Sequence, residues 1–485
     1  MNLLGNGPPA ASPTEARTFP EKSGAAAASP GKVMASKSAI LFNSDRAGGG
    51  ISWWLPLMAL LLLPVILFFR TGFFFFEDDW TTLIQMTGNP FWRYLTLPDG
   101  EQWFPFFHLV YYALVSLGGE RYYLFVLINC LGTGVNAFLL YLFFRRQWRL
   151  APALALSLFY AGAALHHAIA WNAFYVCYLL SLGFFLGALL LTDDYLHSPS
   201  PAGLVGIGAC ALLSILSHNY TLLALPALPL YALLLGDPGA RQKCPALTMM
   251  VAIVYLPFVL GYLTFAGAPA AASHNLGILS NLPGLGYFLH LACGAFLAPF
   301  FYLFWGYFHF PVYAMVFGSI LLAGTLSLIW FKGAARERRL MLWAMLFNAL
   351  PFLLISLARY QRPAGQAFVA RYGVFTLVGA LLLVGTAWTI LARRFPGDGR
   401  LKILSLGLLA WFFTAQIVTL PRWQAGYLEA ARAARLVYER LGQRDNPDPI
   451  PPEIFARFCP TAHPTLTAGQ VKAIRQLLRP PPPTP

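Results

Sequence analysis

A chain of 485 residues that is 58% hydrophobic and only 11% charged is not an ordinary soluble domain, because such domains are about 45–50% apolar and about 25% charged. The mean hydropathy of +0.60 and repeated apolar runs of about twenty residues instead indicate a polytopic membrane protein embedded in a lipid bilayer. The net charge of +14 does not indicate nucleic-acid binding, since many basic residues form short clusters beside apolar runs, where they act as topology signals.

The chain begins with a polar segment that is predicted to stay unfolded. Residues 1–50 are rich in Ala, Gly, Ser and Pro and have few large apolar side chains, so we expect a disordered cytoplasmic tail. No apolar core follows a basic start near Met1, which argues against a signal peptide. Strand-type alternation is absent from the apolar runs, so they are predicted to be helices. In chain order these runs cover 51–69, 104–118, 122–144, 150–168, 173–192, 202–217, 220–236, 245–265, 283–310, 311–331, 340–358, 372–392 and 403–420.

The positive-inside rule indicates which of these runs cross the membrane. The run 104–118 is short, opens at Pro105 and contains His108, so it is predicted to be an interfacial helix. The run 283–310 is predicted to be a re-entrant or interfacial hairpin, because the next basic cluster then falls inside. The fold class is therefore predicted as all-α with about eleven crossings, against about thirteen if every run crossed, with the N-terminus inside and the C-terminus outside. The basic residues placed inside are Arg145, Arg146, Arg149, Arg241, Lys243, Lys332, Arg336, Arg338, Arg339, Arg393, Arg394, Arg400 and Lys402.

This topology places three polar features on the outer side of the membrane. They are the loop 70–121 with Glu77, Asp78 and Asp79, the segment 165–172 with His166 and His167, and the segment 358–372 with Arg359, Arg362 and Arg371. Acids at the end of a spanning helix are unfavourable unless they are solvated or paired. Outward arginines run against the positive-inside rule and suit phosphate groups. His218 also falls at a span end, but it is too isolated to assign.

The last segment, 421–485, is predicted to lie outside the transmembrane domain of residues 51–420. Apolar side chains recur at helical spacing from Trp423 to Leu441, which predicts an amphipathic helix lying on the membrane or capping the outer face. The terminal run of prolines predicts an extended tail.

Several stretches together resemble one family, the GT-C integral membrane glycosyltransferases, which include the protein O-mannosyltransferases and the aminoarabinose transferases of lipid A. The resemblance is one of layout over residues 51–420, and no subfamily is recognised. The stretches that carry it are FFFFEDDW (73–80), FPFFHLVYYALVSLGG (104–119), YYLFVLINCLGTGVNAFLLYLFFRR (122–146), LSLFYAGAALHHAIAWNAFYVCYLLSLGFFLGALLL (156–191) and ARYGVFTLVGALLLV (370–384).

The resemblance implies transfer of a sugar from a polyprenyl-phosphate donor to an acceptor hydroxyl on a lipid, glycan or protein, at the external side of the plasma membrane. A carboxylate takes the acceptor proton, and cationic groups stabilise the leaving lipid phosphate. A single displacement with inversion is expected, because no enzyme nucleophile is required. No cofactor is assigned with certainty; if a divalent ion takes part, one of the acids would bind it through oxygen.

Carried over to this chain, Asp78 is the predicted base and Asp79 its partner, with the pair Glu77 and Asp78 as the alternative. Arg371 with Tyr372 is the leading phosphate contact. The residues predicted to assist in substrate binding are Glu77, His166, His167, Arg359 and Arg362.

Two other functions are consistent with many apolar spans. A transporter or glycolipid flippase often shows internal repeats and discontinuous helices at mid-membrane. This chain shows no convincing repeat, and its candidate polar residues cluster at one surface. An O-antigen polymerase or ligase would also present outward Arg and His, but is not expected to depend on acids after the first span.

Overall fold

A computed structural model describes residues 53–75, 78–99, 102–265, 296–297, 311–359, 370–397, 399–441 and 468–478. Within these ranges the elements are α-helices and short 3-10 helices. The described residues form no β-strand, and one isolated β-bridge joins Asp99 and Gln102. The all-α prediction is therefore confirmed for the part of the chain that the structure describes. The predicted tail 1–50, the predicted hairpin 283–310 apart from residues 296–297, and the terminal prolines lie outside the described residues.

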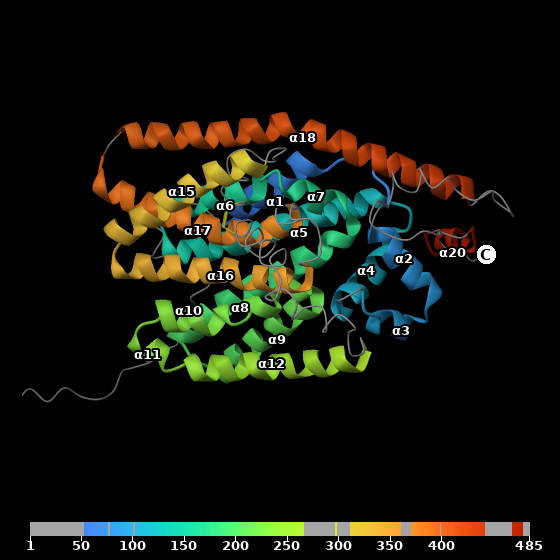
Figure 1. Cartoon of the computed structure of the whole chain (residues 1–485), viewed down its shortest axis with the longest axis horizontal. Coiled ribbons are helices and arrows are strands. Elements are labelled where there is room, and N and C mark those ends of the chain that lie inside the picture. The colour runs from blue at the N-terminus through green and yellow to red at the C-terminus, as the bar shows by residue number, and fades with distance from the viewer. Residues whose placement is uncertain are drawn as a thin grey trace, which may run out of the picture. The chain divides into compact units, whose positions relative to one another are not determined.

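Figure 1 shows the helices in chain order. The helices before the first long one are α1 (Trp54–Phe68), α2 (Asp78–Gly88), α3 (Phe91–Thr96) and α4 (Pro105–Gly118). The central elements are α5 (Tyr122–Gln147), α6 (Leu150–Gly162), α7 (His166–Trp171), η3 (Ala173–Tyr175), α8 (Val176–His197), α9 (Pro201–Ser217), η4 (Asn219–Ala224), α10 (Ala227–Leu235), α11 (Pro238–Arg241) and α12 (Cys244–Phe265). The last elements are α15 (Pro311–Lys332), α16 (Ala335–Arg359), α17 (Ala370–Arg394), α18 (Gly399–Leu441) and α20 (Ala468–Leu478).

Many of these helices have the apolar character of membrane spans. Of the described helices, 5 are long and apolar enough to cross a bilayer, and six shorter apolar helices accompany them. The long ones are Tyr122–Gln147, Ala173–His197, Pro238–Phe265, Arg371–Arg394 and Gly399–Glu439. The number of actual crossings stays a prediction.

The basic clusters gather at one end of the helix bundle, which we call the basic end. Its polar contacts include Arg146 with Asp193 (2.9 Å), Arg336 with Gln147 (3.1 Å) and Arg393 with Glu337 (3.0 Å). Lys243 donates to the carbonyl oxygen of Leu196 at the same end. Four basic clusters are thus neighbours in space, as the positive-inside rule requires. They lie at the end of α5, the start of α12, the start of α16 and the end of α17.

The predicted outer residues gather at the opposite end, which we call the acidic end. The indole N–H of Trp171 donates to the carbonyl oxygen of Phe68 (2.7 Å), which joins the end of α7 to the end of α1. Tyr122 and Asp79 join the start of α5 to α2 (3.0 Å). Figure 1 shows α2, α3 and α20 at this end and α11 at the other. Successive apolar helices therefore run in alternating directions between the two ends.

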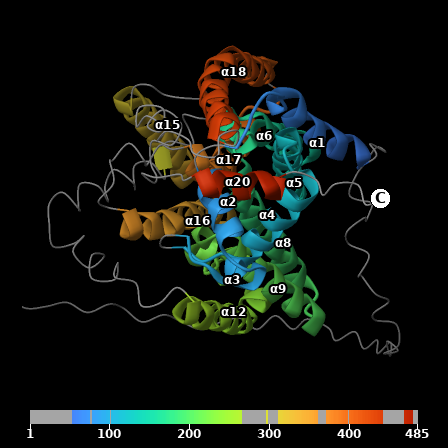
Figure 2. The ribbon, with the colours of Figure 1, turned by 90° about the vertical axis from the view of Figure 1, so that its right-hand side faces the viewer.

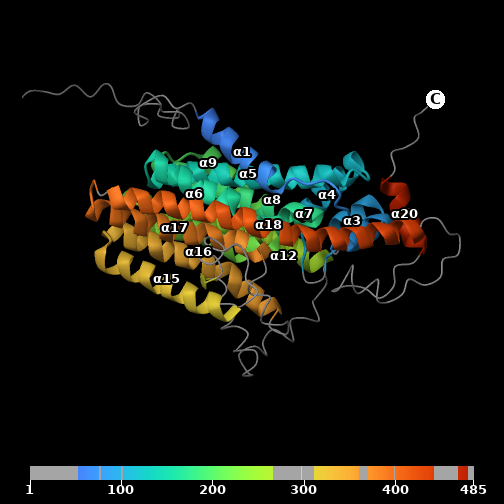
Figure 3. The same ribbon diagram turned by 90° about the horizontal axis from the view of Figure 1, so that it is seen from above.

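One predicted helical run is divided, and one predicted domain boundary falls inside a helix. The run 150–168 does not form one helix, because α6 ends at Gly162 and α7 begins at His166. The predicted domain boundary between residues 420 and 421 lies within α18, which has 43 residues and continues through Pro421 (Figure 3). At 1.5 Å per residue this helix is about 64 Å long, roughly twice the 30 Å thickness of a bilayer core.

The C-terminal helix α20 was not predicted as a separate element. It packs against α2 and α4, crossing in front of them in Figure 2, and it buries Val471, Ile474 and Leu478. Gly119 allows this approach, because a β-carbon there would lie 2.5 Å from the carbonyl oxygen of Leu478. Gly119 also has φ +53°, a conformation that other residues rarely adopt.

The arrangement predicts opposite accessibility for the two ends. In a variant without the native cysteines, a cysteine at Lys472 is expected to react with an impermeant thiol reagent applied outside intact cells, because α20 lies at the acidic end. A cysteine at Ala334, between α15 and α16 at the basic end, is expected to react only after the membrane is opened. Labelling of the two positions in the reverse pattern would contradict the orientation.

Candidate functional site

The acidic motif after α1 forms the first turn of α2, rather than a hydrated loop. Asp78 and Asp79 occupy that turn, where the partial positive charge of a helix N-terminus stabilises carboxylates. Phe73, Phe74 and Phe75 before it belong to no helix or strand, and the indole N–H of Trp80 donates to the carbonyl oxygen of Phe75 (2.8 Å). Glu77 lies outside the described residues. The two aspartates have different surroundings, although they are adjacent in the sequence.

Asp79 is completely buried, with 0% of its surface exposed. Its carboxylate accepts hydrogen bonds from the hydroxyls of Tyr111 (3.4 Å) and Tyr122 (3.0 Å) and from the backbone N–H of Phe174 (2.7 Å). These donors come from α4, α5 and η3, so Asp79 ties α2 to three other elements. Tyr122 strengthens the junction, because its hydroxyl also accepts from the backbone N–H of Ala173 (3.0 Å). This position gives Asp79 a structural role.

Asp78 faces a cationic group from a distant part of the chain. Its side chain is 36% exposed, and one carboxylate oxygen lies 3.9 Å from Nη1 of Arg371, whose side chain is 19% exposed. Arg371 opens α17, so the pair joins the first turns of two helices. The sequence interpretation placed these two residues on the same side of the membrane, and the structure brings them together.

Tyrosine side chains surround the guanidinium of Arg371. It donates to the hydroxyl of Tyr175 and lies 5.5 Å from the ring centroids of both Tyr175 and Tyr372, within the range of cation–π attraction. Its Nε is buried and has no hydrogen-bond partner among the described residues. The guanidinium is thus held firmly while one of its donors is left unused.

The same tyrosines belong to a closed series of aromatic side chains in which each ring contacts the next. We call this series the circuit. Starting from Arg371, the centroid distances are 5.6 Å for Tyr175–Tyr178, 4.2 Å for Tyr178–His218, 6.4 Å for His218–Tyr220 and 6.2 Å for Tyr220–Tyr372. His218 is itself fixed, since its Nδ1 accepts from the backbone N–H of Tyr220 (3.0 Å). The circuit links η3, α8, η4 and α17 behind the Asp78–Arg371 pair.

Sequence reasoning missed four members of this circuit. Tyr175, Tyr178 and Tyr220 were not singled out, and His218 was left unassigned. The predicted topology could have identified them, because it places these span ends on the same side of the membrane as Arg371. Tyr372, which was predicted to bind substrate, is buried behind Arg371.

The histidines predicted to contact the donor lie in the packed interior. His167 stacks on Trp423 with ring centroids 5.0 Å apart, and His166 meets Tyr160 at 4.7 Å. Both belong to α7, outside the apolar helices, and burial lowers the pKa of His166 to about 3 and that of His167 to about 4. Both imidazoles are therefore neutral at neutral pH and offer no positive charge to a phosphate. Their predicted role in substrate binding stays a prediction.

These two histidines predict a pH dependence of stability. In the unfolded chain a histidine titrates near 6.5, whereas in the fold His166 and His167 stay neutral to much lower pH. As the pH falls from about 7 to about 5, only the unfolded chain gains these protons, so the stability should decrease. Unfolding midpoints measured across this range should fall less steeply for the His166→Phe, His167→Phe double variant. An equally steep decrease would contradict the assignment.

The remaining predicted site residues are only partly covered by the structure. Arg359 ends α16, but its side chain is outside the described part, and Arg362 lies between the described ranges. Among the described residues no group of three or more His, Cys, Asp or Glu side chains is arranged to hold a metal ion. Assistance by these arginines and a bound divalent ion both stay predictions.

Comparison with known proteins adds no relative. No protein-family model matches the sequence, and a search of the curated proteins found no match. The resemblance to the GT-C glycosyltransferases therefore rests on the sequence layout.

Proposed function

We propose that this protein is a membrane glycosyltransferase that moves a sugar from a polyprenyl-phosphate donor to an acceptor hydroxyl at the outer membrane surface. The observation that supports the proposal best is the meeting of Asp78 and Arg371, from distant parts of the sequence, at one end of an apolar helical bundle. A half-exposed carboxylate beside a held guanidinium provides the two groups that a displacement from a phosphate requires.

In the proposed reaction the acceptor oxygen attacks the anomeric carbon from the side opposite the phosphate. The new carbon–oxygen bond forms as the bond from the anomeric carbon to the phosphate oxygen breaks. The departing lipid phosphate keeps that electron pair, and Asp78 takes the proton from the acceptor hydroxyl. No enzyme nucleophile is involved, so the configuration at the anomeric carbon inverts.

Arg371 is proposed to bind the donor phosphate and the leaving phosphate after it. The side chain of Arg371 is 19% exposed, so part of its guanidinium can meet a phosphate oxygen, and arginine can bind phosphate through two parallel hydrogen bonds. Tyr175 and Tyr372 fix the orientation of the guanidinium. Asp79 is proposed to position α2, and through it Asp78, rather than to act on the substrate, because its carboxylate is already occupied by three donors.

The membrane side of this site is proposed from the charges. The basic end is assigned to the cytoplasm, because cytoplasmic loops carry an excess of Lys and Arg. The acidic end is then external, where a lipid-linked sugar can meet an acceptor outside the cell. The lipid tail of the donor would stay in the bilayer beside the apolar helices.

The role of Arg371 predicts a defect in the use of the donor. Arg371→Gln is expected to raise the KM for the donor by about 10- to 100-fold, because charge-assisted hydrogen bonds contribute about 1.5–3 kcal/mol each. Proteoliposomes would be supplied with a panel of labelled polyprenyl-phosphate hexoses and pentoses, with a membrane extract as acceptor. Arg432→Gln, at an exposed position of α18, is the matched control. An unchanged KM in the Arg371 variant would contradict the phosphate role.

The same assay addresses the proposal as a whole. Transfer by the wild-type protein from any donor in the panel supports a transferase. Movement of labelled lipid across the bilayer with no transfer to any acceptor would overturn the proposal in favour of a flippase.

A further inference from the structure

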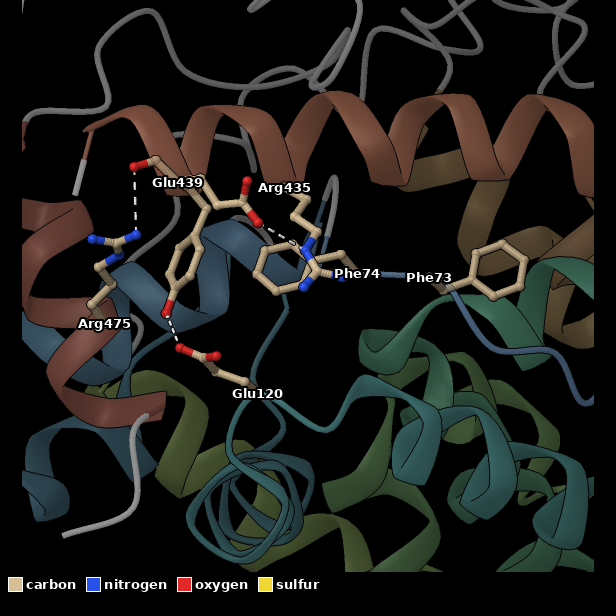
Figure 4. Close-up of a pocket in the computed structure, with 7 residues that line it drawn as sticks. Phe73, Phe74, Glu120, Arg435, Glu439 and Arg475 are labelled. Atoms are coloured by element: carbon tan, nitrogen blue, oxygen red, sulfur yellow. Dashed lines mark hydrogen bonds and ion pairs between the residues drawn. The ribbon is translucent and has the colours of Figure 1, made fainter. Parts of the chain in front are cut away.

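A polar pocket lies beside the candidate catalytic segment. It has a volume of about 210 Å³ and lies between the C-terminal part of α18, helix α20, the connection from α4 to α5 and the residues before α2 (Figure 4). This volume is several times the roughly 30 Å³ that a water molecule occupies in the liquid and below the roughly 300 Å³ at which pockets for drug-sized ligands begin. It suits one small ring rather than a single ion or a long chain.

The walls of the pocket include buried aromatic side chains. Phe73 and Phe74 come from the segment before α2, and Tyr438 comes from α18. The rings of Phe74 and Tyr438 lie 5.1 Å apart, and Tyr438 also contacts Trp80 of α2 at 6.2 Å. The pocket is therefore connected to the helix that carries Asp78, although neither Asp78 nor Arg371 lines it.

The polar groups of the pocket carry charges of both signs. Glu120 accepts from the hydroxyl of Tyr438 (2.7 Å), and Arg435 donates to Glu439 (3.0 Å). Arg475 lies 4.9 Å from the ring centroid of Tyr438 and donates to the backbone oxygen of Glu439 (3.4 Å). Figure 4 shows these side chains around the same space.

One donor in this pocket is left unsatisfied. The Nε of Arg475 is buried and has no hydrogen-bond partner among the described residues. A buried donor of a charged group is costly to leave without an acceptor. This Nε is itself enclosed by the chain, so a ligand in the pocket would meet the outer nitrogens of the Arg475 guanidinium.

The balance of charges selects the class of ligand. An anion would meet the carboxylates of Glu120 and Glu439, and a cation would meet the guanidinium groups of Arg435 and Arg475. A neutral ring with several hydroxyls satisfies both, because each hydroxyl can donate to a carboxylate and accept from a guanidinium. These are the features of a sugar ring.

We propose that this pocket binds one ring of a carbohydrate. The pocket lies near the far end of α18, about 27 Å beyond Leu420 at 1.5 Å per residue, and at the acidic end of the bundle, which is proposed to face the external side. Water-soluble glycan chains reach this position. The inference goes beyond the proposed transfer reaction and does not depend on it, because binding requires no lipid-linked donor.

The test is direct binding to the full-length protein in nanodiscs, where no sugar-based detergent competes. Saturation-transfer difference NMR would be recorded with the methyl glycosides of glucose, galactose, mannose and arabinose. We expect saturable signals from the ring C–H groups of at least one glycoside. Glu120→Gln and Arg435→Gln should each weaken this binding by about tenfold or more, which corresponds to about 1.4 kcal/mol, while Arg432→Gln should leave it unchanged.

Both test variants change exposed side chains and should leave the fold intact. Glutamine at 120 keeps an oxygen that can accept from Tyr438, so α18 should stay docked, and unchanged thermal unfolding would verify this. Lack of a saturable signal from every glycoside would overturn the inference. So would binding that both variants leave unchanged, or a signal that inorganic phosphate displaces, which would indicate an anion site. Failure of sugar transfer alone would contradict the proposed function and leave this result standing.

Discussion

Replacing Asp78 with asparagine is expected to reduce sugar transfer by about 10²- to 10⁴-fold, the usual contribution of a general base. The change preserves the shape of the side chain but removes its ability to take a proton. Asp78 is partly exposed and forms an ion pair with Arg371, so the variant should fold and insert normally. The measurement is the initial rate of transfer from a labelled polyprenyl-phosphate sugar, normalised to the amount of folded protein.

Two further variants sharpen this prediction. Asp78→Glu keeps the carboxylate and should recover part of the activity. Glu429→Gln removes a carboxylate from an exposed position of α18 and should have no effect. Full activity in Asp78→Asn would show that Asp78 is not the base and would favour the alternative carboxylate, Glu77.

Replacing Asp79 with alanine is expected to destabilise the protein by about 1–3 kcal/mol. The change leaves the buried hydroxyl of Tyr111 without its acceptor, whereas Tyr122 can still donate to the carbonyl oxygen of Trp171 and the N–H of Phe174 to the side chain of Asn172. An unsatisfied buried group costs about 1–3 kcal/mol. Thermal unfolding in nanodiscs, followed by intrinsic fluorescence, should show a clear decrease in the midpoint. A midpoint equal to that of the wild type would contradict the structural role.

The asparagine variant separates structure from chemistry at this position. In Asp79→Asn the side-chain oxygen can still accept from Phe174, and the new amide can donate to Tyr122, whose hydroxyl then donates to the carbonyl oxygen of Trp171 (3.0 Å). This variant should therefore be more stable than Asp79→Ala and keep most of the transfer activity. A stable but inactive Asp79→Asn protein would instead support the predicted part of Asp79 in catalysis.

The sequence predicted well those features that follow from hydrophobicity and charge. The apolar runs located most of the long helices, and the basic clusters correctly grouped the loops of one end. The same map placed Asp78 and Arg371 on one side, because each crossing reverses the direction of the chain. Their separation of 3.9 Å could not be predicted, since it depends on how α2 and α17 pack.

The features that were missed depend on tertiary contacts. Asp78 and Asp79 have the same chemistry, and only the rotation of about 100° per residue along a helix directs one toward Arg371 and the other into the core. The apolar run 403–420 and the amphipathic segment from Trp423 were predicted as separate parts, yet α18 joins them in one helix through Pro421. The position of α20 depends on Gly119, whose bare backbone accepts the end of that helix.

Because α18 is much longer than a bilayer core is thick, a change in its tilt within the membrane moves its far end. Its first half is apolar, and its far end carries Tyr438, which holds Glu120. A helix whose apolar length differs from the bilayer thickness responds by tilting. A tilt of a few degrees in a rod about 64 Å long displaces its tip by several ångströms. Acyl-chain length in the surrounding membrane would thus set the spacing between Tyr438 and Glu120, so thin and thick bilayers should yield different affinities for sugar.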